Sequence, residues 1–204
     1  MGDASALWLS CLGRLAGRAA HELKNPLNGL ALNLEVVRSR SARAGTEGVA
    51  LAPFAAAAAC ELERTIPLVE ALLALARPLP IPVDLRTAVQ PLSVLYGAIA
   101  VASGGSLTME FLSEQMFVAG DSNAVRALLA EALDVTIGAN LEVTAKLGHS
   151  DGIVSLRMIG GAGRPIAAKM ERLAAEQHMQ FSSDEDETAL LFSALTRAGV
   201  NSNT

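Results

Sequence analysis

Aromatic residues and an excess of basic residues are what this sequence most clearly lacks. Aromatic side chains make up 3% of the 204 residues, whereas 51% are apolar, with alanine and leucine the most frequent. This composition favours helices packed through small side chains over an aromatic-rich β-sandwich. The net charge is −5, with both signs interspersed. Because a nucleic-acid-binding surface needs a basic patch, we expect no nucleic-acid partner.

Cysteine is also scarce, and no targeting segment is visible. Cys11 and Cys60 are the two cysteines, and each lies in an apolar stretch, so we expect both to be small core side chains. No CxxC or Cys/His cluster predicts a metal site. The first residues show no signal-peptide pattern, and no apolar run looks long enough to span a bilayer. We therefore expect a cytoplasmic protein without a membrane partner.

Residues 1–78 have the repeat pattern of two amphipathic helices. Apolar residues recur at steps of three and four, first between about Ala4 and Arg43 and again between Leu51 and Ala76. They are Leu12, Leu15, Ala19, Leu23, Leu27, Leu30, Leu34 and Val37, then Leu51, Phe54, Ala58, Leu62, Ile66, Val69, Leu73 and Ala76. The segment GTEG (45–48) separates the two helices, so we expect an antiparallel hairpin. A lone hairpin leaves its apolar stripe half covered. We therefore expect a homodimer in which two hairpins form a four-helix bundle.

The segment RPLPIPV (77–83) marks a boundary between two domains, 1–78 and 79–204, because its three prolines end the second helix. Beyond it, helical patterns cover 85–101, 121–137 and 165–178, and strand patterns cover 106–112, 116–120, 141–148, 152–160 and 188–195. Asp121 and Ser122 are the expected caps of the second helix. The segment 182–187 reads as a solvated turn. We expect an α/β sandwich with a mixed sheet here, so the whole chain belongs to the α+β class.

The segment RAAHELKNPLNGL (18–30) places a histidine on a helix just upstream of a proline. At about 100° per residue, His21 lies about 200° from both Ala19 and Leu23, so it points away from the apolar stripe. Pro26 cannot donate a hydrogen bond to the carbonyl of Glu22, and a bend there would open the surface around His21.

Polar neighbours accompany this histidine. Asn25 and Asn28, four and seven residues on, share its face, and Glu22 and Lys24 flank it. From this geometry alone, an ordinary surface histidine beside an unrelated proline is an equal alternative to a functional one. His149 and His178 have no partners at a useful spacing, and we expect both on the surface.

The segment HELKNPL (21–27) resembles the phosphoacceptor motif of bacterial two-component histidine kinases, His-Glu-(Leu/Ile)-(Lys/Arg)-(Asn/Thr)-Pro-Leu. In that family the motif lies on the first helix of a dimeric four-helix bundle, and ELERTIPLVEALLALARP (61–78) is similar to the second helix. The resemblance implies that His21 carries a phosphoryl group on a ring nitrogen. It also implies that Glu22 accepts a hydrogen bond from the other ring nitrogen, and that Asn25 orients water for dephosphorylating a partner.

The second half resembles the ATP-binding domain of the same family only weakly. In an ungapped match of 118–140, Val135 takes the position of the family's magnesium-binding asparagine, and Glu131 takes that of an earlier asparagine. A shift of the match by one residue would place Asp134, instead of Val135, at the magnesium-binding position. In RMIGGAGRPI (157–166), the aspartate that reads adenine falls at Ile159, while Gly161 and Gly163 are retained. Neither the family's second glycine-rich segment nor the lid before it has a counterpart. We therefore expect no use of ATP and no bound cofactor, with Mg²⁺ supplied by the partner.

An intact phosphoacceptor half beside a degenerate kinase half resembles the histidine phosphotransferases built on the kinase scaffold. The expected function is to pass a phosphoryl group between receiver-domain aspartates of response regulators through His21. Lys24, Leu27 and Asn28 are the expected partner-binding residues, with the degenerate domain adding contacts. Two alternatives stay open, namely an ATP-dependent kinase with an unusual ATP site and a pseudokinase scaffold that binds response regulators.

Overall fold

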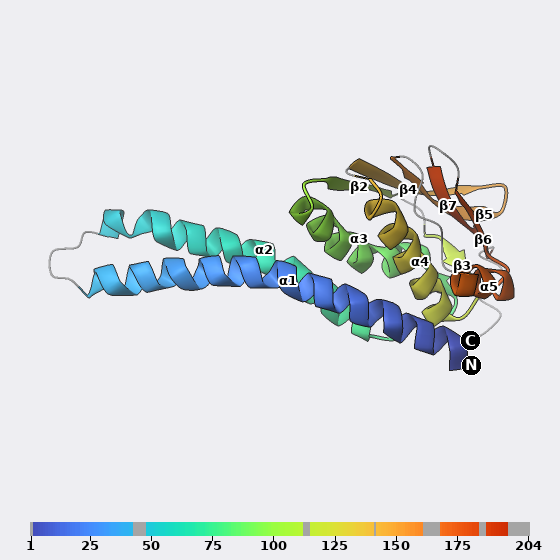
Figure 1. Ribbon diagram of the computed structural model, residues 1–204, viewed down its shortest axis with the longest axis horizontal. Helices are drawn as coiled ribbons and strands as arrows, with labels where there is room; N and C mark the ends of the chain where they lie inside the picture. Colours follow the sequence, from blue (N-terminus) through green and yellow to red (C-terminus); the bar gives the residue numbers. More distant parts are fainter. Residues whose placement is uncertain are drawn as a thin grey trace.

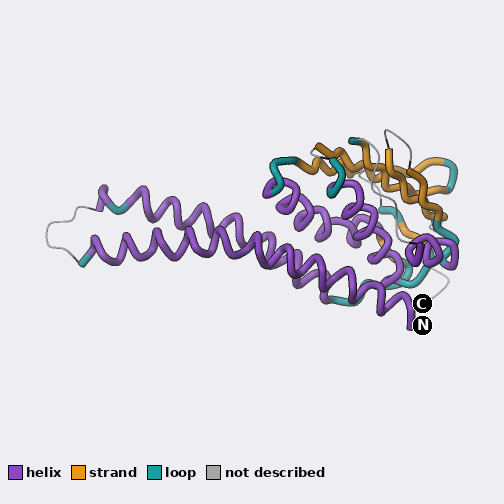
Figure 2. The backbone as a smooth tube through the Cα atoms, viewed as in Figure 1, coloured by secondary structure: helices purple, strands orange, loops and turns teal. Residues whose placement is uncertain are grey.

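A long helical hairpin and a helix-covered sheet make up the chain (Figure 1). The computed structural model describes residues 2–42, 48–111, 115–140, 142–160, 168–183 and 187–195. The hairpin consists of α1 (Gly2–Ser41) and α2 (Ala52–Ala76), with the short 3₁₀ helix η1 (Gly48–Ala50) before α2. The loop end of the hairpin projects away from the sheet, whereas the first half of α1 runs along the helices that cover it (Figures 1 and 2).

The expected helical hairpin is confirmed, and α1 continues through Pro26 without a break. Pro53 lies in the first turn of α2, where the missing N–H of a proline costs no helical hydrogen bond. The face that α2 buries differs from the expected stripe, since only Ala58 of that stripe is buried. Its buried residues are Ala58, Thr65, Leu68, Ala71 and Leu75.

The remaining elements alternate between strands and helices. They are β1 (Val83–Asp84), α3 (Leu85–Ala102), β2 (Ser106–Phe111), β3 (Phe117–Val118), α4 (Ser122–Ile137), β4 (Glu142–Ser150), β5 (Ile153–Ile159), α5 (Ala168–Glu176), β6 (Gln180–Ser183) and β7 (Glu187–Ser193). Asp121 caps α4, as expected, because its carboxylate accepts hydrogen bonds from the N–H groups of Asn123 and Ala124. The chain is thus of the α+β class, with long helices first and a mixed sheet after them.

The main sheet has the strand order β2-β4-β5-β7-β6, and β1 pairs with β3 separately. β2 runs parallel to β4, and the other neighbours are antiparallel, so the sheet is mixed as expected. Asp151 and Gly152 join β4 to β5 with positive φ angles of 52° and 76°, which a two-residue type I′ turn requires.

One detail of the expected sheet is wrong, because an additional strand, β6, pairs with β7 and forms the edge of the sheet. β6 includes Ser182 and Ser183, which we expected in a solvated turn, and residues 184–186 lie outside the described part of the chain. This short strand contains a single large apolar residue, Phe181, as suits a polar edge strand.

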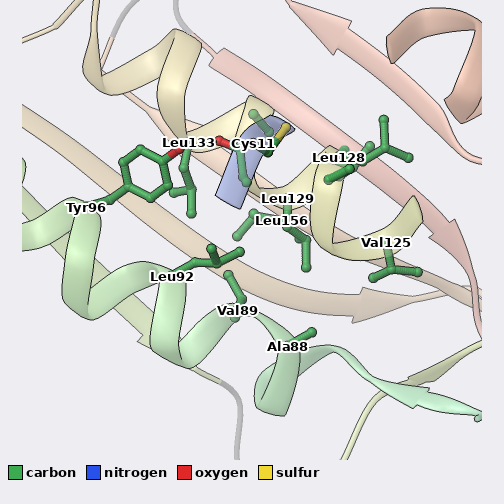
Figure 3. Close-up of a cluster of buried hydrophobic side chains, with 14 of the residues drawn as sticks. Cys11, Ala88, Val89, Leu92, Tyr96, Val125, Leu128, Leu129, Leu133 and Leu156 are labelled. Atoms are coloured by element: carbon green, nitrogen blue, oxygen red, sulfur yellow. Dashed lines mark hydrogen bonds between the residues drawn. The ribbon is translucent and has the colours of Figure 1, made fainter. Parts of the chain in front are cut away.

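The core is centred on α4, which is buried along almost its whole length. Helix α1 contributes Cys11, α3 contributes Leu92 and Tyr96, and β5 contributes Leu156 to the side chains gathered around α4 (Figure 3). Leu7, Trp8 and Leu15 of α1 belong to the same cluster, so one core joins the hairpin to the sheet layer. The domain division at residue 78 stays a prediction.

One of the two cysteines does not lie in the core as we expected. Cys11 is buried, but Cys60 is exposed. The run of alanines around Cys60 has no apolar periodicity, so the sequence could not predict which side of this helix is buried.

The apolar helix α3 also differs from the expectation that no segment is long enough to span a bilayer. Among the described residues, α3 is long and apolar enough to cross a membrane by length and composition alone. A core helix passes the same test, and eight residues of α3 are buried in the fold. A cytoplasmic location stays a prediction.

Candidate functional site

His21 lies in a groove of about 700 Å³ between the hairpin and the end of α3. Three elements supply its walls. The lining residues are Arg18, His21, Glu22, Asn25 and Pro26 from α1, Arg64 and Leu68 from α2, and Gly97, Ala98, Ile99, Val101, Ala102 and Ser103 from the last turns of α3 and the residue after it.

Helical periodicity brings the polar residues of α1 to the groove together. Arg18, His21, Glu22 and Asn25 follow one another at steps of three, one and three, which places them on one side of the helix. On another side, Ala19 is 1% exposed and anchors α1 in the core. The helix is therefore held by apolar residues while the His21 imidazole is exposed, as the sequence predicted.

The structure brings together three of the six residues that the sequence singled out. His21, Glu22 and Asn25 line the groove. Lys24, Leu27 and Asn28 are exposed on α1 but are not among the residues that line it, although Asn28 lies on the same side of the helix as His21. Their role in partner binding stays a prediction, as does the hydrogen bond from His21 to Glu22.

Positive charge predominates on the groove lining. Its charged side chains are Arg18 and Arg64 against the single carboxylate of Glu22, and the His21 imidazole lines the same groove. The Arg18 guanidinium forms an ion pair with Asp134 of α4 and lies 5.9 Å from the centre of the Tyr96 ring. Arg64 forms an ion pair with Glu61, one turn away, at 3.6 Å, and its side chain is 68% exposed. A nucleophilic imidazole beside guanidinium groups suits a phosphoryl group, whose oxygens accept charge-assisted hydrogen bonds.

The carboxylates of α4 are paired with α1. Glu131, at one of the positions matched to an asparagine of the kinase family, accepts a hydrogen bond from Arg14 at 2.9 Å. Asp134 pairs with Arg18, and Val135 is 7% exposed. Within the described residues, no group of three or more His, Cys, Asp or Glu side chains forms a metal site. Ile159, which was matched to the adenine-reading aspartate, is exposed at the end of β5. The two retained glycines of that segment, Gly161 and Gly163, lie outside the described residues.

Several groove residues were not identified from the sequence. Arg18 could have been found, since it lies three residues before His21 on the same side of the helix. Arg64 and the end of α3 could not, because only the packing of α3 beside the hairpin brings them near His21. His149 and His178 are exposed and lie outside the groove, as expected.

Solved structures similar to this chain include histidine kinases and a phosphotransferase. The Acinetobacter baumannii histidine kinase AdeS is 13% identical, with a TM-score of 0.46 over 86% of this chain and 98% of that one. A bacterial phosphotransferase is 17% identical, with a TM-score of 0.42 over 88% and 95% of the two chains. The histidine kinase ThkA, solved in complex with the response regulator protein TrrA, is 16% identical, with a TM-score of 0.43 over 92% and 63%.

No protein-family model matches the chain, and no curated protein matches it. The three identities are below 20% and the three scores below 0.5. These likenesses therefore assign neither a substrate nor a partner to this chain.

Proposed function

We propose that this chain is a histidine phosphotransferase that relays a phosphoryl group between receiver-domain aspartates through His21, without using ATP. The observation that carries the proposal is the exposed His21 imidazole in a groove whose other charged groups are mainly guanidinium groups. Such a groove favours an incoming phosphorylated carboxylate and balances the charge that builds up during transfer.

The transfer has two balanced steps. A ring nitrogen of His21 attacks phosphorus with its lone pair, and the bond between phosphorus and the aspartyl oxygen breaks, so the receiver's carboxylate leaves with that electron pair. The other ring nitrogen keeps its proton and donates it in a hydrogen bond to Glu22, which offsets the positive charge of the ring. A carboxylate of a second receiver then attacks phosphorus, and the pair of the N–P bond returns to the ring.

The proposal assigns no metal or nucleotide to this chain. The bound receiver supplies Mg²⁺, which neutralises charge on the phosphoryl oxygens. The pairing of Glu131 and Asp134 with arginines of α1 supports this assignment, because carboxylates held by guanidinium groups are not free to hold a metal. The buried aliphatic side chain of Val135 offers no oxygen ligand.

A second copy of the chain completes the proposed assembly. Leu62, Ile66, Val69 and Leu73 form a stripe on α2 at steps of four, three and four, and each is between 41% and 56% exposed. Leu27 and Leu34 of α1 are exposed as well. A contiguous apolar surface of this kind marks an interaction site, and a dimeric four-helix bundle would bury it.

A phosphotransfer assay tests the function. Purified protein is incubated with a labelled phosphoreceiver, and separately with labelled ATP without a receiver. Label should pass from the receiver to the protein and be lost in His21→Gln, while His149→Gln, which changes another exposed histidine, should retain it. Label taken from ATP alone would identify an autophosphorylating kinase instead. If neither source labels the protein but it still binds receivers, it is a scaffold.

A further inference from the structure

The last turns of α3 form the wall of the groove that faces the hairpin. Ala98, Val101 and Ala102, which we call the α3 wall, line the groove. The residues between them, Ile99 and Ala100, are 4% and 3% exposed, so the core holds this part of the helix in place. Val101 is 64% exposed even though it is an aliphatic residue on a core helix.

We propose that the α3 wall is a docking surface for the receiver domain, which places an apolar side chain against Val101 beside its aspartyl phosphate. This inference rests on the proposed function, since it names a further contact of the partner that reaches His21. It concerns a segment far in sequence from the histidine motif.

Access to the histidine supports a contact at this wall. To react, phosphorus must come within bonding distance of the His21 ring, and the same groove that exposes this ring is lined by Val101 on its other side. A partner that fills the groove therefore touches both walls. Gly97, Ala98 and Ala102 carry little or no side chain, so the surface of the partner can approach the backbone of α3 closely.

The distribution of charge favours a receiver over a second copy of this chain. The charged groups of the groove lining are two guanidinium groups and one carboxylate, whereas the chain as a whole carries a net charge of −5. An acidic phosphorylated pocket complements that lining. The exposed stripe of α2, by contrast, does not line the groove, so dimerisation through the stripe leaves the α3 wall open.

A charge placed at Val101 tests the proposal. Val101→Glu puts a carboxylate at the contact, and the matched control is Leu9→Glu, which changes an aliphatic residue that is 65% exposed on α1 and does not line the groove. The rate of transfer from a phosphoreceiver to His21 is measured against receiver concentration. In parallel, phosphoramidate, a small phosphodonor that needs no docking surface, labels His21 directly, and light scattering gives the assembly state.

We expect Val101→Glu to lower kcat/KM for the receiver about tenfold or more, mainly through KM. Phosphoramidate labelling and the assembly state should not change, and Leu9→Glu should behave like the wild type. An unchanged receiver rate in Val101→Glu would overturn the α3 wall while leaving the proposed function intact. A loss of phosphoramidate labelling or of the dimer would also overturn it, by assigning Val101 to another role. If the wild-type protein accepts phosphoramidate but no receiver label, the proposed function itself fails.

Discussion

Arg14 and Glu131 lie 117 residues apart in sequence, yet the guanidinium of the first donates to the carboxylate of the second at 2.9 Å. The Glu131 side chain is 11% exposed and that of Arg14 is 47% exposed, so the pair lies at the edge of the core. One turn further along both helices, Arg18 pairs with Asp134. These two ion pairs fix α1 on α4, and with it the position of His21 relative to the end of α3.

Removing Arg14 should destabilise the fold. Arg14→Leu keeps the apolar part of the side chain but leaves Glu131 without its donor, so we expect a loss of about 1–3 kcal/mol in the free energy of unfolding by urea. The double variant Arg14→Leu/Glu131→Leu should regain part of this loss. Arg38→Ala, which removes an exposed ion pair with Glu35 on α1, should change nothing measurable. Equal effects of Arg14→Leu and Arg38→Ala would contradict the assignment.

Tyr96, the single tyrosine of the chain, should make stability fall at alkaline pH. Its hydroxyl donates to the carbonyl of Ala130 at 2.9 Å, and burial, aided by the charge of Asp134, raises its pKa although Arg18 opposes the shift. Because the pKa is higher in the folded state, this contribution to stability is complete below the unfolded pKa of about 10 and is lost as pH rises above it.

Near-ultraviolet absorbance of tyrosinate, recorded while pH is raised, measures this effect. We expect the tyrosinate signal to appear together with unfolding, and Tyr96→Phe to flatten the alkaline limb of the stability curve. Ionisation near pH 10 in a chain that stays folded would show that the hydroxyl is accessible to solvent.

The two cysteines should differ in reactivity. Cys60 is exposed, whereas Cys11 is 3% exposed and burial raises the pKa of its thiol, although the nearby Arg14 charge opposes this. A maleimide should therefore modify Cys60 alone in the folded chain and both thiols in denaturant. Mass spectrometry counts the adducts. Rapid labelling of folded Cys60→Ser would mean that the α1–α4 contact opens readily.

A charge in the α2 stripe should dissociate the proposed dimer. Ile66→Glu places a carboxylate where a second hairpin would bury an aliphatic side chain, and light scattering should then give the mass of a single chain while circular dichroism stays helical. Ile153→Glu is the matched control, since Ile153 is 45% exposed against 46% for Ile66 and lies in the sheet. Dissociation by both substitutions, or by neither, would count against a dimer built on the stripe.

Asn25 should separate dephosphorylation of a partner from phosphotransfer. If its amide orients the attacking water, Asn25→Ala should slow the loss of phosphate from a bound phosphoreceiver about tenfold or more. Transfer from the receiver to His21 should continue, because the attacking ring nitrogen is unchanged. Asn33→Ala, which alters another amide of α1 that donates to the backbone carbonyl of Gly29 and does not line the groove, should affect neither rate. Parallel loss of both activities in Asn25→Ala would indicate a general role in docking.

Periodicity and local chemistry were sufficient to predict most elements of this fold. α3 was expected over 85–101 and extends one residue further, and the Asp121 cap forms as expected. β6 was missed because a four-residue strand with one large apolar side chain has no usable period. Its backbone pairing with β7, rather than its own sequence, makes it a strand.

Only part of the candidate site could be predicted from the sequence. Helical spacing alone places His21, Glu22 and Asn25 on one side of α1. Arg64 and Val101 join them through the packing of three helices, which no spacing within one segment encodes. The arginine partners of Glu131 and Asp134 were likewise invisible in the sequence, because the two helices involved are more than a hundred residues apart.

The contact between the first half of α1 and α4 joins two segments that are synthesised at different times. A ribosome releases Trp8 and Leu15 first, but α4, on which this half of the helix lies, emerges more than a hundred residues later. Contacts of such long range form slowly, since a large loop must close before they contribute any stability. A nascent chain that ends before α4 carries His21 but has no α4 to position α1. The walls of the groove all come from residues 18–103, but the two ion pairs that fix α1 on α4 form only after α4 has been made.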